Sequence, residues 1–160
     1  MRPNKIKTVK AKKALFLLPN YKALTWKGIV YCAKKEDVES INKTNEIDSD
    51  LKSHETIHVR QAESMNNSWF RFYIRYIWDW LKNVTLIFVN IHAAYKFIAT
   101  EMEAYLNQED YSYANKGCVY QWKDFEKIKL KEKRKWAKEY YSKDNYKTFT
   151  QFLRDKLNKD

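Results

Sequence analysis

The sequence predicts an α+β fold that is predominantly helical, with short β-strands near the N-terminus followed by a bundle of helices. The 160 residues include only 2 Gly and 2 Pro, which is too few for a loop-rich β-sandwich or a disordered chain. The stretches that read as strands lie before residue 34, whereas helical patterns and capping residues recur from residue 48 onward. A chain of this length is expected to form a single domain, over residues 14–160, with a sizeable hydrophobic core.

The N-terminal part is expected to consist of an arm and two strands. Residues 1–13 carry five lysines and predict a flexible basic arm. Ala14–Leu18 and Ala23–Ala33 are rich in β-forming residues, and Pro19-Asn20 between them is a turn signal. The two segments are therefore expected to form a short antiparallel pair.

Helices are expected over most of the remaining chain. Asp48 or Ser49 can cap a helix that runs to about Met65, where Asn66-Asn67-Ser68 breaks it. The polar residues 34–47 before it predict a loop with a short helical turn. Four further helices are expected, at Trp69–Lys82, Val84–Gln108, Gln121–Tyr141 and Asn145–Asn158, with a loop at Tyr111–Val119.

Charge and cysteine content bear on partners and location. With 31 Lys and Arg against 20 acidic residues, the formal net charge is +11. This excess favours anionic partners such as nucleic acid or a membrane surface, although a solvated basic surface explains it equally well. Cys32 and Cys118 are too few for a disulfide framework and lack metal-binding spacing, so free thiols in a reducing compartment are expected. No segment has the pattern of a signal peptide, and a cytoplasmic protein is expected.

The apolar residues 84–99 are too few to cross a bilayer, which takes about 20 consecutive apolar residues. They also carry Asn90, His92 and Lys96, so a buried core helix is expected there. The aromatic segment Trp69–Trp80 lies in a strongly basic chain, and that combination leaves peripheral contact with a membrane surface open.

The motif His54-Glu55-Thr56-Ile57-His58 is the strongest functional signal in the chain. Two of the three histidines are spaced i, i+4, which on a helix puts both imidazoles on one face, one turn apart, where they can bind a single metal ion. Glu55 lies beside His54 and can act as general base toward a metal-bound water. The pattern predicts a zinc site, although imidazole and carboxylate ligands also accept other divalent metals.

A catalytic zinc site needs a third protein ligand, for which the sequence offers three candidates. The residues three, four and seven positions before Glu101, which share its face on a helix, are the apolar Ile98, Phe97 and Ala94. This is expected for a buried face that carries a ligand. The residues at the same positions before Glu103 predict a boundary or solvent face. On a continuous helix His92 would lie about 180° from Glu101, so the two cannot both face the site. Glu101 is the favoured ligand, with Glu103 and His92 as the alternatives.

Two further residues are candidates for supporting roles. Gln61 follows His58 by three residues and shares the metal-facing side of its helix, where it can hydrogen-bond a ligand or simply join two helices. Tyr105 lies one turn beyond Glu101 and can orient a ligand or donate a hydrogen bond to a developing oxyanion. Plain packing is the alternative role for Tyr105.

The segments HETIHVRQ and AYKFIATEMEAY together resemble the gluzincin metallopeptidases, in which a glutamate from a later helix joins two helical histidines. Glu101–Tyr105 is similar to the ExxAD segment of the CAAX-prenyl endopeptidase and HtpX-like families. The chain is more similar still to small bacterial proteins with a HExIHxxQ helix and a later FExEAY segment. Two departures stand out: Tyr105 replaces the Asp of the larger families, and Thr100 replaces the Phe of the small ones.

The resemblance implies a zincin-like domain in which His54, His58 and Glu101 bind Zn²⁺ and Glu55 takes a proton from the metal-activated water. It implies a metallopeptidase acting on peptides or proteins, with an extended substrate adding to the strand at Ala23–Ala33 by β-augmentation.

Two rival functions follow from other features of the chain. The first is a catalytically inactive zincin-like module for binding or scaffolding. The second, less favoured, is a nucleic-acid binder that uses Trp122, Trp136 and Tyr140 among the lysines, but the chain has no known nucleic-acid-binding motif.

Overall fold

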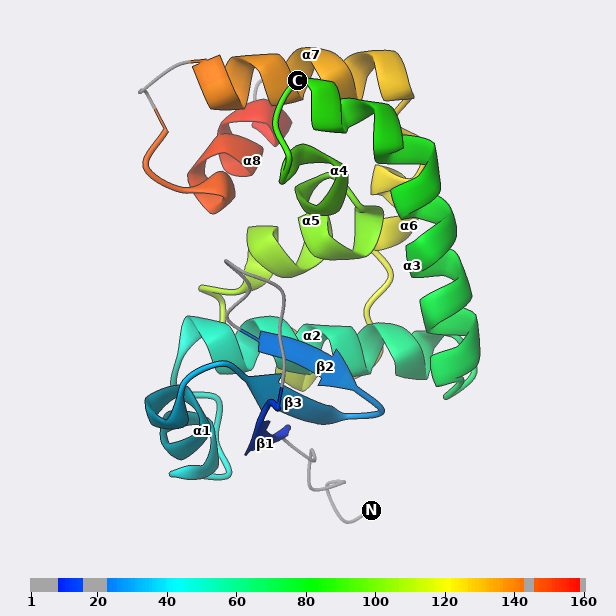
Figure 1. The fold of residues 1–160 in the computed structure, drawn as a ribbon. Coiled ribbons are helices and arrows are strands. Elements are labelled where there is room, and N and C mark those ends of the chain that lie inside the picture. Colours follow the sequence, from blue (N-terminus) through cyan, green and yellow to red (C-terminus); the bar gives the residue numbers. More distant parts are fainter. Residues whose placement is uncertain (1–8, 16–22, 143–145, 159–160) are drawn as a thin grey trace.

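The computed structural model describes residues 9–15, 23–142 and 146–158. It confirms the prediction of an α+β fold that is predominantly helical: a three-stranded sheet formed near the N-terminus is followed by helices to the end of the described chain (Figure 1).

The sheet consists of β1 (Lys10–Lys13), β2 (Ala23–Trp26) and β3 (Ile29–Cys32), in the spatial order β1-β3-β2. β2 and β3 pair antiparallel as a hairpin, and β1 pairs with β3 in parallel. The hairpin turns at Lys27-Gly28, where both residues have positive φ, 49° and 80°, as a tight two-residue turn requires. The single strand predicted at Ala23–Ala33 is therefore wrong, because this turn divides it in two.

The predicted flexible arm over residues 1–13 is wrong for Lys10–Lys13, which form β1. Val9 and Ala11 are buried and alternate with exposed lysines, so the period-2 pattern of a half-buried strand is present among the charges. Residues 1–8 lie outside the described residues. Of the strand predicted at Ala14–Leu18, the first two residues are not in a strand, and the other three are not described.

The helices begin and end as follows: α1 Lys35–Asn42, α2 Asp50–Ser64, α3 Trp69–Asn83, α4 Ala93–Lys96, α5 Ala99–Asn107, α6 Trp122–Phe125, α7 Leu130–Ser142 and α8 Phe149–Leu157. Two 3₁₀ helices, η1 (Val84–Phe88) and η2 (Tyr113–Lys116), lie between them. The helix predicted at residues 121–141 is divided into α6 and α7, and that predicted at residues 145–158 begins later, at Phe149, after the cap residue Thr148.

The central helix α2 has the predicted boundaries for a local reason. The Ser49 hydroxyl accepts a hydrogen bond from the Lys52 backbone N–H, which caps the first turn. After Ser64 the chain enters Asn66 and Asn67, both with positive φ, 62° and 54°, which end the helix. The cap of the next helix is Ser68, which accepts from the Arg71 backbone N–H.

α2 is the central helix of the fold and lies between the sheet and α5 (Figure 1). The sheet and α1 cover one side of α2, and α5 packs across its other side. α3 runs along the edge of the molecule, and α7 and α8 lie beyond α5. The largest core cluster is built from the C-terminal end of α2, from α3, α5, α7 and α8, and from the segments between them. Trp122, Trp136 and Tyr140, the aromatic residues considered for nucleic-acid binding, pack against this cluster.

The third helix predicted, at Val84–Gln108, is wrong because the chain is broken into η1, α4 and α5. Ile98 has an extended conformation between α4 and α5, with ψ of 134°. The buried Asp79 carboxylate accepts the Ala99 N–H at 2.6 Å, and the Asn83 amide donates to the Phe97 carbonyl at 2.8 Å. Side chains from α3 therefore satisfy the backbone groups that the break releases.

The described helices include none that is both long enough and apolar enough to cross a bilayer. For the segment 84–99 the reason is visible: it is divided among short helices and supplies the buried residues Leu86, Ala93, Ala94 and Phe97.

Replacing Asp79 by Ala is expected to lower the free energy of unfolding by about 3–5 kcal/mol, because it deprives one buried group of its acceptor and another of its counter-charge. These are the Ala99 N–H and the Lys133 ammonium, which lies 3.6 Å from Asp79. Chemical denaturation measures the difference. Lys82→Ala is the matched control, since the Lys82 ammonium also lies near Asp79, at 3.1 Å, but is 45% exposed, and its loss should cost at most about 1 kcal/mol. Equal losses in the two variants would contradict the role given to Asp79.

Candidate metal centre

α2 places the three motif residues on its buried surface. His54, Glu55 and His58 are each 5–6% exposed, and the i, i+4 spacing stacks the two imidazoles one turn apart. Their Nε2 atoms lie 3.2 Å from one another, with the ring planes at 83°. Both Nε2 atoms are therefore directed at one point beside the helix.

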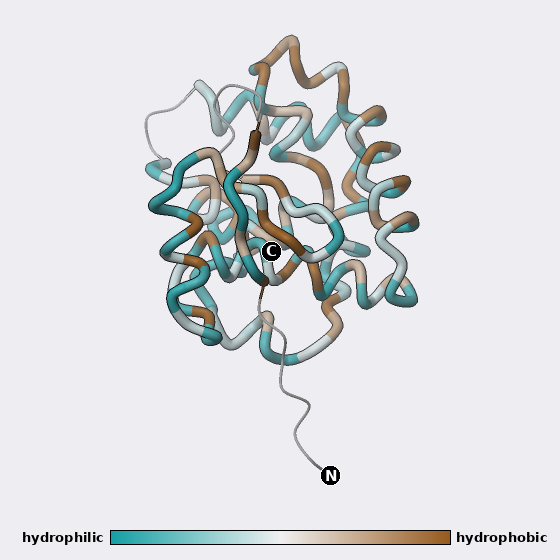
Figure 2. The backbone as a smooth tube through the Cα atoms, turned by 60° about the horizontal axis from the view of Figure 1, so that its bottom comes forward, coloured by the Kyte–Doolittle hydropathy of each residue, from teal (hydrophilic) through white to brown (hydrophobic). Residues whose placement is uncertain are grey.

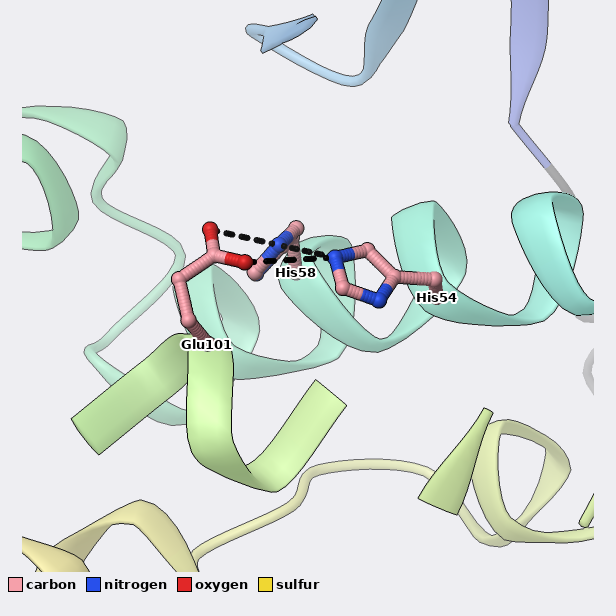
Figure 3. A group of neighbouring side chains, drawn as sticks. All are labelled: His54, His58 and Glu101. Carbon is pink, nitrogen blue, oxygen red and sulfur yellow. Dashed lines mark hydrogen bonds and ion pairs between the residues drawn. The ribbon is translucent and has the colours of Figure 1, made fainter. Parts of the chain in front are cut away.

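α5 brings Glu101 to that point. Its carboxylate lies 3.3 Å from His54 Nε2 through Oε2 and 3.3 Å from His58 Nε2 through Oε1 (Figure 3). The side chain is 2% exposed, and the Tyr76 hydroxyl donates to Oε1 at 2.9 Å. Oε2 is buried, and no group meets hydrogen-bond geometry at this oxygen, although His54 Nε2 lies 3.3 Å away. A buried carboxylate oxygen without a well-placed donor is costly unless a cation lies beside it.

Each histidine is held in the tautomer that a metal ligand needs. His54 Nδ1 lies 3.1 Å from Gln108 Oε1, and His58 Nδ1 lies 2.8 Å from Gln61 Oε1. Since an amide oxygen only accepts, each Nδ1 carries a hydrogen, so that each imidazole in its neutral form has its lone pair on Nε2. Histidine ligands in metal sites are commonly oriented in this way by a hydrogen bond from the other ring nitrogen.

The three side chains fit a zinc ion. Zinc–ligand bonds of about 2.0–2.2 Å in a tetrahedron put neighbouring ligand atoms about 3.3–3.5 Å apart. The two Nε2 atoms are 3.2 Å apart, and each lies 3.3 Å from a different oxygen of the Glu101 carboxylate. With one ligand atom taken from each residue, the three atoms lie within 4.8 Å of one another. They form the only group in the described part of the chain in which three such side chains could share one ion.

The charges of this group depend on one another. Burial by itself would lower the pKa of His58, but the negative charge of Glu101 and its hydrogen bond raise it to about 9. Burial would raise the pKa of Glu101, yet the two histidines hold it well below its usual range. In the absence of metal, a proton on His58 therefore serves as the counter-charge of Glu101.

Glu55 lies beside this group in a cavity of about 480 Å³. One of its carboxylate oxygens, Oε2, accepts a hydrogen bond from the Thr25 hydroxyl of β2. The cavity also contains residues of β2, α2, α4 and α5: Ala23, Asp50, Leu51, His54, His92, Tyr95, Lys96, Tyr105 and Gln108. A proton acceptor and one of the three candidate ligands, His54, thus line one cavity large enough for part of a peptide.

Tyr105 lies at the wall of the cavity, with its ring 4.7 Å from the His54 ring in an edge contact. Burial and the charge of Glu101 raise its pKa above the ordinary tyrosine value, so its hydroxyl stays protonated at neutral pH. Tyr95 lines the same cavity, and burial with the charge of Glu101 raises its pKa in the same way. Both phenols are therefore hydrogen-bond donors near the ligand group.

Glu103 and His92, the alternative third ligands, are not in the ligand group. Glu103 is fully buried, contrary to the boundary or solvent position predicted for it. Its carboxylate accepts from Gln61 Nε2 at 2.7 Å, from the Tyr113 hydroxyl at 2.8 Å and from the Gln121 N–H at 2.7 Å. Glu103 thus fixes the side-chain amide of Gln61, whose oxygen is the partner of His58 Nδ1.

His92 lines the cavity but offers no ligand atom to the group. His92 was placed opposite Glu101 on the assumption of a continuous helix, and that assumption is wrong because the chain is broken between α4 and α5.

Sequence reasoning gave no role to several residues around the site. Gln108 was detectable, since it follows Glu101 by seven residues on the same helical face. Thr25, Tyr76 and Tyr95 were not, because each reaches the site from an element whose position depends on tertiary packing.

The edge of β2 beside the site is partly closed. The Tyr73 hydroxyl donates to the Thr25 carbonyl at 3.3 Å and accepts from the Lys27 N–H at 3.0 Å, and the Tyr73 ring stacks on Trp26 at 4.6 Å. A peptide adding to this edge would have to do so near Ala23, which lines the cavity.

Comparisons with models of known protein families, with curated proteins and with solved structures find no match. The functional assignment therefore rests on the residues and geometry described above.

The pKa of His58 predicts that zinc binding depends on pH. In the metal-free protein the proton on His58 stabilises the fold fully below about pH 6.5, and this contribution is lost as the pH rises through about 9. Zinc requires the neutral imidazole and must displace this proton. We expect the zinc affinity to increase up to about tenfold per pH unit between pH 6.5 and 9. Competition with a chelator measures the zinc affinity. An affinity that does not change between these pH values would contradict the pairing of a protonated His58 with Glu101.

Proposed function

We propose that the protein is a zinc-dependent metallopeptidase of the gluzincin type. The observation that carries this proposal is the cavity in which the Glu55 carboxylate lies beside the buried group His54, His58 and Glu101. Three protein ligands leave one coordination position of a tetrahedral zinc open, which is the arrangement of catalytic rather than structural zinc sites.

Zinc in such a ligand set supplies Lewis acidity, which makes water a better nucleophile near neutral pH and polarises a substrate carbonyl. The protein's own contribution is to position the ligands and to move protons. Because Glu101 is desolvated and both imidazoles are held at Nδ1, the three ligands keep their places without help from solvent.

Glu55 is the residue suited to the proton transfers. The Thr25 hydroxyl fixes one of its carboxylate oxygens and leaves the other available to take a proton from the attacking water. The same carboxyl group can then deliver that proton to the amine leaving group. Tyr105, whose ring lies beside His54 and whose hydroxyl is neutral, is suited to donate a hydrogen bond to an oxyanion.

Glu55→Gln is expected to reduce hydrolysis by at least about 100-fold while zinc stays bound, because the amide keeps the shape of the side chain but cannot take a proton. Activity is measured on a mixture of fluorescence-quenched peptides, and metal content by mass spectrometry. Glu39→Gln makes the same change at an exposed position on α1 and should leave both unchanged. His58→Ala should lose the zinc.

Two results would argue against the proposal. Hydrolysis that survives in Glu55→Gln would remove Glu55 from its role. One zinc per chain with no hydrolysis by the unmodified protein would favour the alternative function, a zincin-like module that binds a partner without cleaving it.

A further inference from the structure

Lys96 is a cation in the wall of the cavity that the mechanism above does not use. It is the last residue of α4 and lines the same cavity as His54 and Glu55. Its ammonium lies over aromatic rings, 5.0 Å from the centroid of Tyr140 and 5.5 Å from that of Phe149. The Tyr140 hydroxyl is its hydrogen-bond partner, at 3.3 Å.

No carboxylate of the described residues lies within ion-pair distance of Lys96. The two fully buried lysines of the described chain differ in this respect: Lys52 lies 3.6 Å from Asp48, and Lys133 lies 3.6 Å from Asp79. Lys96 is half-buried, and the aromatic faces around it stabilise a cation without neutralising it. An anion entering the cavity would find this charge unpaired.

Lys96 also lies at a suitable distance from the metal ligands. Tyr105 lies close to both: its ring is 4.7 Å from the His54 ring and 6.0 Å from the Lys96 ammonium. The ammonium is therefore about one aromatic ring away from the ligand group. Roughly two to three residues of extended peptide, at about 3.3 Å each, span that separation.

We propose that Lys96 binds a carboxylate of the substrate, so that the preferred substrates are peptides with a negative charge within a few residues of the cleaved bond. This inference rests on the proposed peptidase function. Two sources supply the same chemistry, the C-terminal carboxylate of a short peptide and the side chain of an internal Asp or Glu.

The test is a binding measurement that needs no turnover. Calorimetry on the Glu55→Gln protein compares three probes: acetylated tetra-alanine with a free carboxylate, its C-terminal amide, and an amidated peptide with one internal Glu. The free acid or the Glu peptide is expected to bind at least about tenfold more tightly than the neutral amide. Whichever of the two binds more tightly identifies the source of the carboxylate.

Lys96→Gln should abolish this preference without weakening the neutral amide, whereas Lys96→Arg should retain it. The comparison is repeated on metal-free protein, where a carboxylate cannot gain affinity by contacting zinc. Equal binding of the three probes by the parent protein, or a preference that survives in Lys96→Gln, would overturn the proposal. Because no step depends on hydrolysis, an inactive protein would count against the proposed function and leave this result interpretable.

A second inference rests on α3, whose outer surface is apolar. Phe70, Ile74, Ile77, Trp78 and Leu81 are 48–73% exposed and recur at helical spacing. The buried side of the same helix includes the polar residues Asp79 and Asn83. Apolar side chains therefore face outward on a helix at the edge of the molecule (Figure 1), and hydrophobic positions recur along it in Figure 2.

The exposed apolar surface continues beyond α3 and has a basic border. Phe88 and Ile91, which follow in the chain, are 86% and 76% exposed. Arg71 and Lys123 line a hollow of about 730 Å³ between α3 and α6, and neither has a carboxylate partner among the described residues. Apolar and tryptophan side chains bordered by cations are typical of surfaces that lie in the interface of an anionic bilayer.

We infer that α3 and residues 87–91 bind the surface of an anionic membrane, without crossing it. Sedimentation with vesicles of equimolar phosphatidylglycerol and phosphatidylcholine is expected to bring down the protein, and vesicles of phosphatidylcholine alone should do so at least about tenfold less well. Replacing both Ile74 and Ile77 by Asn should weaken binding at least about tenfold. Leu24→Asn, at a residue 53% exposed on β2, is the matched control.

Failure to bind anionic vesicles would overturn this second inference. So would a stable dimer in light scattering that the Ile74 and Ile77 replacements convert to monomer, because the apolar surface would then be covered by a second copy of the chain.

Discussion

The hydrogen bond from the Ala99 N–H to the buried Asp79 carboxylate is the constraint on which the site depends. It fixes where α5 begins, and Glu101 lies two residues into that helix. Since each residue turns a helix by about 100°, a start displaced by one residue would direct the Glu101 carboxylate away from α2. Burying Asp79 with Lys133 is costly in itself, and such pairs often contribute little net stability. The role of Asp79 here is to fix the residue at which α5 begins, and thereby the direction of the Glu101 side chain.

Once α5 is placed, the two motif helices orient each other. α2 supplies both histidines, while α5 supplies Glu101, the proposed third ligand, and its cap residue Gln108 is the partner of His54. Glu103 acts through Gln61: its carboxylate accepts a hydrogen bond from the Gln61 amide, and the Gln61 amide oxygen is the partner of His58 Nδ1. The glutamates at 101 and 103 are thus close in sequence but have different environments, because they lie on opposite sides of one helix. One carboxylate faces the ligand group, and the other satisfies amide and hydroxyl donors.

Local signals in the sequence were sufficient for some of this and insufficient for the rest. The cap at Ser49 and the i, i+4 histidines depend on neighbours within one or two turns, so the position of α2 could be predicted. The break before α5 could not, because its polar partners Asp79 and Asn83 come from α3. The burial of Glu103 was missed for the same reason, since η2 and the start of α6 cover it. Arguments from helical faces are valid only within a helix that is in fact continuous.

The charges around the cavity connect the metal to the choice of substrate. Without metal, the proton on His58 balances Glu101, while the wall of the cavity carries the carboxylates of Asp50 and Glu55 and the ammonium of Lys96. A divalent ion would replace that proton and add one further positive charge in a poorly solvated place. Glu101 and Glu55 would then offset the ion, and Asp50 and Lys96 would remain as the anion and the cation of the cavity wall. Because the ion would make the cavity more positive by one charge, metal binding would both enable the chemistry and strengthen the preference for an anionic peptide.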